Sequence, residues 1–440
     1  MRANKFANII LIGGLLIFVM ILADVFFSLR YHELSNYDFL VSLISIVGIV
    51  ICSFAFKLRP DYKINLVLTG LSIVFTVYLV EIILFYGPSQ EKLRRAERLQ
   101  VANKMGISFD TRKTREVIKE LKKGGVDAVR VFAPTFLVEF NGIEREGKRI
   151  FPLSGLSRKT TVLCNENGEW AIYESDEHGF NNPTGLYDGQ IDTVLVGDSF
   201  TAGECVRQRE DIASQLRMSG VRVLNLGSVS SGTLVEYAIL KEYAEPKQPK
   251  YVFWMYYEGN DLKDLRHEQQ SSFLLKYRDN LFSQQLIKRQ PEIDFLLENL
   301  KMRKWQWLKY NFMRRFKLKN LRKRLALVIP PSPPLSLFTE LLEKARNLTS
   351  SWGGQLYFVY LPSWARYAKE VEQGTFHHRN QVLSIVKHLN IPIIDIHEKV
   401  FVTHPDPLSL FPFRLNGHYT TEAYRLVAQA IHTNLVTVHK

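Results

Sequence analysis

Ser199 occupies a position that suits a nucleophile. Gly197, Asp198 and Ser199 directly follow the apolar run 191–196, which is typical of a buried strand. A serine at the tight turn from a strand into a helix exposes its hydroxyl above the sheet edge, and the glycine allows the turn. The alternative is an ordinary turn or helix cap made by the Asp and Ser side chains. The motif therefore predicts acyl chemistry only if further groups converge on it.

Two other motifs could donate hydrogen bonds to the oxyanion of such a reaction. Gly227 ends a second apolar run, where its backbone N–H can face a ligand. Gly259, Asn260 and Asp261 follow a third run and place an amide donor at the same edge of a parallel sheet. Each lost oxyanion donor costs roughly 100- to 1000-fold in rate. The two motifs are weak alone and gain weight by following consecutive strands.

His418 is the histidine best placed to act as the base. It lies in a polar, turn-like stretch, 416–424, directly before the last amphipathic helix and after the last predicted strand. From there it could reach the edge of the sheet that carries Ser199. A capping or surface role is the alternative, whereas core packing does not suit a polar turn.

This ordered set of motifs resembles the SGNH (GDSL-type) hydrolase superfamily, in its membrane-anchored bacterial form. The resemblance covers about residues 190–437 and implies a flavodoxin-like three-layer α/β/α domain with no metal or organic cofactor. It implies that Ser199 is the nucleophile, that His418 is the base, and that the Ser199 N–H, Gly227 and Asn260 are the oxyanion donors. The supporting residues would be Asp198, Gly197, Gly259 and Asp261.

The chain departs from the family pattern at two places. Phe200 stands where the family name has Leu, which we expect to change packing without affecting the chemistry. The family usually carries its orienting acid two or three residues before the histidine, where this chain has Asn416 and Leu415. An Asn can accept a hydrogen bond from the imidazole but cannot stabilise the imidazolium as a carboxylate does; in serine proteases the Asp-to-Asn change lowers turnover about 10⁴-fold.

Several outcomes therefore stay open at Asn416. The protein could be a slow enzyme that uses Asn416, a Ser/His dyad, or an enzyme that recruits another acid such as Asp406. It could also be a silent domain that binds glycan or scaffolds a cell-surface polysaccharide assembly or export complex. A purely structural membrane protein is the weakest option, because it leaves the Ser, Gly, Asn and His set unexplained.

Alternating strands and helices must position these residues. Five apolar runs predict the strands, and the helices between them predict a mostly parallel sheet covered on both faces. The runs are 191–196, 221–226, 250–257, 355–361 and 391–396, and the helices are 210–218, 232–243, 335–348, 378–389 and 421–437. Before them, 88–125 reads as a charged linker helix and 126–182 as a small β-rich segment. We therefore expect domains at 1–87, 88–190 and 191–440, with a helical insertion at about 262–334.

The amino-terminal part reads as a membrane anchor of three helices. The stretches 8–29, 39–56 and 65–86 are apolar, and the first has about the length that spans a bilayer core. Lys and Arg in the short loops favour a cytoplasmic amino terminus and a periplasmic or extracellular carboxy-terminal domain. Asp24 and Glu81 would then lie in the same leaflet, either as a polar entrance to the site or simply at the interface. Cys164 and Cys205 are the only cysteines outside the anchor, and both a disulfide and two free thiols are open.

The basic charge is concentrated in one segment. The chain has 440 residues, a net charge of +13 and 46% hydrophobic residues, which excludes a disordered chain. Residues 301–324 contain eleven Lys or Arg and no acid, with an aromatic and aliphatic stripe at helical spacing. Such a helix suits an anionic membrane surface, or it packs as a solvated helix on its own domain; a nucleic-acid partner does not fit an outward-facing domain.

The expected function is that of a membrane-anchored serine esterase or O-acyltransferase. Its substrate would be an acyl ester, with acetyl favoured, of a cell-envelope glycan or lipid, and the family resemblance does not choose between hydrolysis and transfer. Other membrane subunits are a further partner class that the anchor allows.

Overall fold

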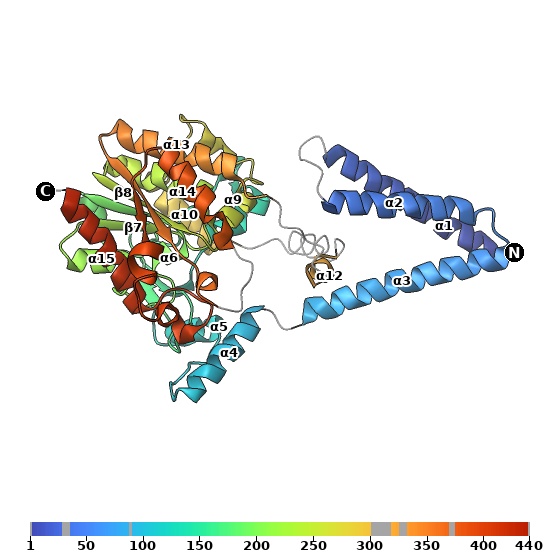
Figure 1. Cartoon of the computed structure of the whole chain (residues 1–440), viewed down its shortest axis with the longest axis horizontal. Coiled ribbons are helices and arrows are strands. Elements are labelled where there is room, and N and C mark those ends of the chain that lie inside the picture. Colours follow the sequence, from blue (N-terminus) through green and yellow to red (C-terminus); the bar gives the residue numbers. More distant parts are fainter. Residues whose placement is uncertain are drawn as a thin grey trace. The chain divides into compact units, whose positions relative to one another are not determined.

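The computed structural model describes residues 2–28, 36–87, 90–300, 318–324, 332–368 and 375–438 (Figure 1). Most of the predicted basic helix, 301–317, lies outside the described residues. Its last part forms helix α12 (Lys319–Arg324).

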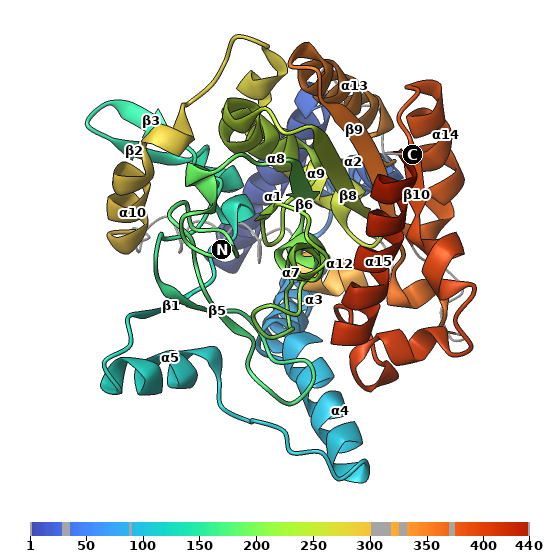
Figure 2. The same ribbon diagram turned by 90° about the vertical axis from the view of Figure 1, so that its left-hand side faces the viewer.

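A five-stranded parallel sheet lies at the centre of the α/β part (Figure 2). Its strands are β6 (Thr193–Gly197), β7 (Val223–Gly227), β8 (Tyr251–Tyr257), β9 (Gln355–Leu361) and β10 (Ile393–Asp395), and their order is β10-β9-β8-β6-β7. All four pairings are parallel. Numbered along the chain this order is 2-1-3-4-5, the flavodoxin-like arrangement, in which ligands bind at the carboxyl ends of the strands near the first strand. The predicted α/β fold is confirmed.

Both faces of this sheet are buried, which explains why its strands read as continuous apolar runs. Successive residues of a strand point to opposite faces. Val194 and Val196 therefore face one hydrophobic core, whereas Leu195 faces the other.

Each core is completed by a different set of helices. The first core contains residues of α8 (Thr233–Ile239), α13 (Leu335–Ser351) and α14 (Arg379–His388). The second contains residues of α7 (Ile212–Met218) and α15 (Thr421–Val438). These are the five helices predicted between the strands, so the expected three layers are present. Shorter helices α6 (Ser199–Ala202), α9 (Asp261–Glu268) and α10 (Gln290–Glu298) follow strands or fill the insertion.

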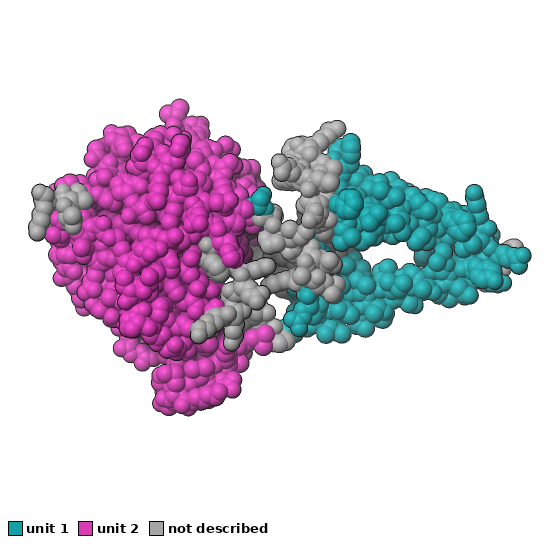
Figure 3. Space-filling model, in the orientation of Figure 1, with its two compact units in different colours: residues 1–90, 301–332 teal, residues 91–300, 333–440 magenta. Residues whose placement is uncertain are grey.

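The chain forms two compact units, residues 1–90 with 301–332 and residues 91–300 with 333–440 (Figure 3). Residues 91–190 thus belong to the same unit as the sheet, although the sequence suggests a boundary at 190. The reason is shared packing, because Phe151, Leu153 and Phe180 lie in the first core of the sheet.

Short strands and two helices make up residues 90–190. Helices α4 (Gln90–Lys104) and α5 (Thr114–Lys123) precede a three-stranded sheet, β1-β4-β5, and a hairpin, β2-β3. The strand bounds are Ala128–Arg130 for β1, Ile143–Arg145 for β2, Lys148–Ile150 for β3, Thr160–Val162 for β4 and Ile172–Glu174 for β5. A disulfide between Cys164 and Cys205 ties the turn after β4 to the turn after α6. This pairing resolves the question that the sequence leaves open.

The smaller unit contains α1 (Arg2–Ser28), α2 (Asn36–Ala55), α3 (Pro60–Tyr86) and α12. Two helical stretches, Ala3–Phe27 and Pro60–Tyr86, are long and apolar enough to cross a membrane. The apolar part of α2, Phe39–Ala55, is shorter. The three spans expected from the sequence are therefore not confirmed.

Glu81 of α3 is buried inside the smaller unit and holds the start of α12. Its carboxylate accepts hydrogen bonds from the backbone N–H groups of Asn320 and Leu321, at 3.1 and 2.7 Å. The Asn320 side-chain amide donates a third, at 2.8 Å. Glu81 thus caps α12, which lies more than 200 residues later in the chain. The sequence predicts a polar entrance or an interface position for Glu81, and neither includes this role.

Removing the disulfide should destabilise the larger unit. The two cysteines are 41 residues apart, and closing a loop of that size contributes about 4 kcal/mol in the chain-entropy model. We expect the variant with both Cys164→Ala and Cys205→Ala to unfold at lower urea concentration than the native protein. Cys52→Ala is the control, since Cys52 is a free thiol in the smaller unit. Equal unfolding midpoints for the double variant and the control would contradict a stabilising bridge.

Candidate active site

Ser199, the predicted nucleophile, is the first residue of α6 and follows the end of β6 after one residue, Asp198. Asp198 caps this helix, since its carboxylate accepts a hydrogen bond from the Phe200 N–H at 2.9 Å. Gly203 ends the helix in a left-handed conformation with φ 78°, which a residue with a Cβ rarely adopts. Ser199 itself is only 7% exposed. The strand, cap and turn therefore hold its hydroxyl at one place on the sheet edge.

His418 lies within hydrogen-bonding distance of this hydroxyl. Its Nε2 is 2.9 Å from Ser199 Oγ, as general-base catalysis requires. The neighbouring Tyr419 fixes the loop, because its hydroxyl donates to the Pro362 carbonyl oxygen at 2.6 Å. The ring of Phe200 packs on the imidazole with 4.7 Å between centroids. Phe200 thus contacts the base itself, which the expectation of a purely packing change did not include.

A carboxylate that the sequence analysis missed contacts the other side of the imidazole. Glu166 Oε2 is 3.3 Å from His418 Nδ1 and also accepts a hydrogen bond from the His418 backbone N–H at 2.6 Å. A neutral imidazole that donates from Nδ1 to this carboxylate leaves Nε2 free to accept the Ser199 proton. Ser199, His418 and Glu166 therefore have the geometry of a Ser-His-acid triad.

Arg98 and Gly417 hold Glu166 in place. Arg98, from α4, donates to Glu166 Oε1 at 2.7 Å and to the Asn416 carbonyl oxygen at 2.8 Å. The Arg98 and Glu166 side chains are only 10% and 12% exposed, so this ion pair is screened little by water. A Cβ on Gly417 would stand 2.5 Å from Glu166 Oε2. Only glycine therefore lets the histidine loop approach the carboxylate so closely.

Asn416 and Asp406, the two residues that the sequence offers for orienting His418, form no hydrogen bond with its ring in the described residues. Asn416 is exposed and offers only its backbone carbonyl, which Arg98 binds. No hydrogen bond joins its side chain to His418 in the part of the chain that the structure describes. Asp406 forms an ion pair with Arg414. Asn416 is the residue predicted to orient the His418 ring. Glu166, from a different segment of the chain, makes this contact instead.

The charged side chains around His418 lower the pKa of Glu166 and raise the pKa of His418. Burial alone would raise the pKa of Glu166, but the positive His418 and Arg98 and the hydrogen bonds from His418 lower it to about 2. Burial alone would lower the pKa of His418, but the Glu166 and Glu204 carboxylates raise it to about 9. The surrounding carboxylates thus stabilise an imidazolium, the form that a histidine base takes after it removes a proton from a serine.

The two predicted oxyanion donors lie at the ends of β7 and β8, but both are already engaged. The Gly227 N–H donates to the Asn225 side-chain oxygen at 2.9 Å. The Asn260 side-chain amide donates to Asp264 at 2.6 Å and also hydrogen-bonds to the Asp198 carboxyl group. A Cβ on Gly227 would lie 2.1 Å from the Ala202 backbone nitrogen. Gly227 therefore allows the nucleophile helix to rest directly on β7.

The residues predicted to support the site are buried around it. Burial raises the pKa of Asp198 to about 7, against hydrogen bonds from the Phe200 N–H and Asn260. Asp261 accepts from the Tyr257 N–H at 2.8 Å and thereby fixes the turn after β8. Cβ atoms on Gly197 and Gly259 would lie 2.3 Å from Thr201 Oγ1 and from the Tyr257 ring, respectively. These four residues shape the turns and make no contact with His418 Nε2 in the described residues.

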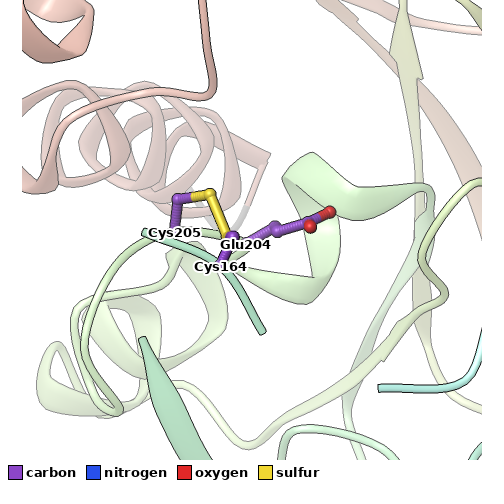
Figure 4. Close-up of side chains that lie close together, drawn as sticks. All are labelled: Cys164, Glu204 and Cys205. Atoms are coloured by element: carbon purple, nitrogen blue, oxygen red, sulfur yellow. A yellow bond between two sulfur atoms is a disulfide. The ribbon is translucent and has the colours of Figure 1, made fainter. Parts of the chain in front are cut away.

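The sequence contains one indication that Glu166 could lie near Ser199. Glu166 is two residues after Cys164, and Glu204 is next to Cys205. The disulfide joins Cys164 to Cys205, with Glu204 beside it (Figure 4). It thereby brings the turn with Glu166 to the turn that follows Ser199, and Cys205 Sγ lies 3.5 Å from His418 Nδ1. Pairing these two cysteines in advance would have placed an acidic residue beside the predicted nucleophile. Without that pairing, nothing in the motif order points to a segment before residue 190.

Replacing Glu166 should impair catalysis far more than replacing Asn416. We expect Glu166→Gln to lower kcat for an ester substrate by roughly 10²- to 10⁴-fold, because the imidazolium loses its counter-charge. Asn416→Ala should change kcat by no more than about twofold, since the Asn416 side chain is exposed. Steady-state hydrolysis of p-nitrophenyl acetate measures both. The assignment of the acid is wrong if the Asn416 variant loses the larger share of activity.

Comparisons with known proteins give similarity only at the level of structure, since no family model and no curated protein sequence matches this chain. Similar solved structures include a member of the lipolytic protein G-D-S-L family from Veillonella parvula (13% identity, TM-score 0.31, 55% of this chain and 97% of that chain). A lipase/acylhydrolase from Enterococcus faecalis (15%, 0.34, 56% and 95%) and an acetyl xylan esterase (12%, 0.33, 56% and 100%) are similar to the same extent. At these values the assignment of the site depends on its own geometry. The sheet order itself agrees with the α/β/α fold that the SGNH (GDSL-type) resemblance implies.

Proposed function

We propose that the protein is an SGNH-type serine esterase that works through an acyl-enzyme on Ser199. The observation that carries the proposal is the continuous chain of contacts from Ser199 Oγ to His418 Nε2 and from His418 Nδ1 to Glu166 Oε2, at 2.9 and 3.3 Å. Each member occupies the position that the chemistry of a triad requires, and each comes from a different segment of the larger unit.

The proposed reaction has two steps. His418 Nε2 takes the proton of Ser199 while Oγ attacks the ester carbonyl, and the same proton then passes to the leaving alcohol. The Ser199 backbone N–H and the Asn260 side-chain amide are the proposed donors to the oxyanion. Asn260 would do so by releasing its hydrogen bond to Asp198, and Gly227 would join them only by releasing its hydrogen bond to Asn225. Water or an alcohol then attacks the acyl-enzyme and releases Ser199, and His418 again acts as the base.

A small acyl group, with acetyl favoured, suits the space beside the nucleophile helix. A cavity of about 20 Å³ is lined by Ala202, Gly227 and Ser228 and, on its other side, by residues of the β-rich segment such as Arg130 and Tyr173. Space of this size holds about one water molecule. A methyl group is of similar size, although the cavity reaches the helix that carries Ser199 only through Ala202.

An ester of a cell-envelope glycan or lipid is the proposed substrate class. The two apolar helices support an anchor in a membrane, and the loop charges favour an outward-facing catalytic unit. The basic segment 301–324 would add attraction to anionic lipid, and other membrane subunits are further proposed partners. The alternative of a silent, glycan-binding domain drew its support from Asn416, and the Glu166 carboxylate beside His418 favours catalysis instead.

Labelling of Ser199 provides the direct test. We expect the purified protein to hydrolyse p-nitrophenyl acetate and to form a fluorophosphonate adduct, because both need a serine activated by a base. Ser199→Ala should abolish the adduct and lower hydrolysis by at least about 10³-fold. Ser175→Ala is the control, since Ser175 is a buried serine whose hydroxyl donates to the Leu156 carbonyl oxygen and which does not line the cavity beside Ala202 and Gly227. Absence of both activities in the native protein would refute the esterase proposal.

The raised pKa of His418 predicts an alkaline pH profile. The base must be neutral, so kcat/KM should rise with pH up to about 9, where His418 loses its proton. Glu166→Gln removes one of the negative charges that raise this pKa, so the rising limb should move to lower pH while the plateau falls. A pH series of kcat/KM for p-nitrophenyl acetate measures both effects. An unchanged limb in the variant would contradict electrostatic coupling between Glu166 and His418.

A further inference from the structure

A second carboxylate, Glu204, lies on the nucleophile side of His418. Its Oε2 is 3.4 Å from Nε2, the nitrogen that also lies 2.9 Å from Ser199 Oγ. Glu166 already orients the ring from the Nδ1 side. The imidazole therefore has a carboxylate at each nitrogen, whereas a Ser-His-acid triad needs only one.

The backbone of Glu204 is fixed relative to Ser199. Its N–H donates to the Ser199 carbonyl oxygen at 2.9 Å, and the preceding Gly203 and following Cys205 are both left-handed, with φ 78° and 67°. The disulfide to Cys164 holds the next residue, and the Glu204 side chain points away from that bridge (Figure 4). The carboxylate is thus aimed at the nucleophile by covalent and conformational constraints.

The short-range partners of this buried acid are the two groups expected to react. The Glu204 side chain is only 14% exposed, and His418 is its sole ion-pair partner in the described ranges. Burial raises the pKa of Glu204, whereas the positive charge of His418, a hydrogen bond from the Ser199 side chain and the charge of Arg130 lower it. A buried carboxylate without a direct Lys or Arg ion pair costs stability, and the position of Glu204 beside Ser199 and His418 is best explained by chemistry.

We propose that Glu204 positions the water molecule that hydrolyses the acyl-enzyme, an inference that rests on the proposed function of Ser199. Once Ser199 is acylated, Nε2 must accept a proton from the attacking oxygen, which has to lie within about 3 Å of it. Glu204 Oε2 borders that position. A water molecule there can donate one O–H to Nε2 and the other to Glu204, so that its lone pair faces the acyl carbon.

The step balances without any other reactant. A bond forms between the water oxygen and the acyl carbon, and the bond between that carbon and Ser199 Oγ breaks. The proton that water gives to Nε2 passes to Oγ and restores the serine hydroxyl. The second hydrogen leaves with the released carboxylic acid, which then ionises in solvent.

This arrangement favours hydrolysis over transfer to a sugar. An alcohol has a single O–H, which Nε2 must receive, so its carbon substituent would replace the hydrogen that water gives to Glu204. The carboxylate would then face an apolar group and lose a hydrogen bond, which is costly for a buried charge. Glu204 thereby selects water as the acyl acceptor, a choice that the Ser, His and Glu166 groups alone do not make.

The partition of the acyl-enzyme between water and methanol tests the proposal. Full-length native protein and the variants Glu204→Ala and Glu204→Gln are given p-nitrophenyl acetate at a fixed methanol concentration, and acetate and methyl acetate are measured. We expect the ratio of methyl acetate to acetate to rise about tenfold or more in Glu204→Ala, because water loses its second contact. Glu204→Gln keeps a carbonyl acceptor of the same size and should give an intermediate ratio.

Glu169→Gln is the matched control. Glu169 is an exposed glutamate that pairs with Arg207 near the same turn, and its neutralisation should leave the ratio unchanged. An unchanged ratio in both Glu204 variants, with the Ser199 adduct still formed, would overturn the role of Glu204 and leave the esterase function standing. Absence of the Ser199 adduct in the native protein would overturn both. The product ratio is independent of the amount of folded enzyme, so partial loss of folding does not obscure the result.

Discussion

The interaction on which the site depends is the buried contact of Glu166 with His418 and Arg98. Taking a carboxylate out of water is costly unless charged partners and hydrogen bonds replace the lost solvation. Glu166 has both, since Arg98 binds one oxygen and two N–H groups of His418 approach the other. The same contacts fix the tautomer of the imidazole and join α4, the turn after β4 and the loop before α15. Stability of this region and competence of the base therefore have a common physical origin.

That dependence explains why residues 91–190 pack as part of the α/β unit. A segment that only decorated the sheet could move away without harm to the site. Here the disulfide, the shared hydrophobic core and the Arg98–Glu166 ion pair attach it at three separate points. The segment also forms one wall of the small cavity beside Ala202 and Gly227. The segment thus both holds His418 in place and limits the space beside the helix that begins with Ser199.

Most of the fold could be predicted from the sequence because both faces of the sheet are buried. Continuous apolar runs marked all five strands, and their order along the chain was enough to place Ser199 and His418 at one edge. The acid could not be found in the same way, since local motif order carries no information about a contact 252 residues apart. The packing role of Gly227 was equally hidden, because it depends on how closely α6 approaches β7. Arg98 lies in the charged linker helix predicted at 88–125, and only its burial against Glu166 distinguishes it from the other charged residues there.

An acid carried by a separate segment also determines how the polypeptide can be divided. A fragment that starts at residue 191 would contain every strand of the parallel sheet, the nucleophile and the base, and it would still lack Arg98, Glu166 and one half of the disulfide. A fragment that keeps the whole proposed triad and its Arg98 partner therefore begins in α4, ahead of the first strand of the parallel sheet by about a hundred residues. The boundary of the parallel sheet is thus not the boundary of the proposed catalytic unit.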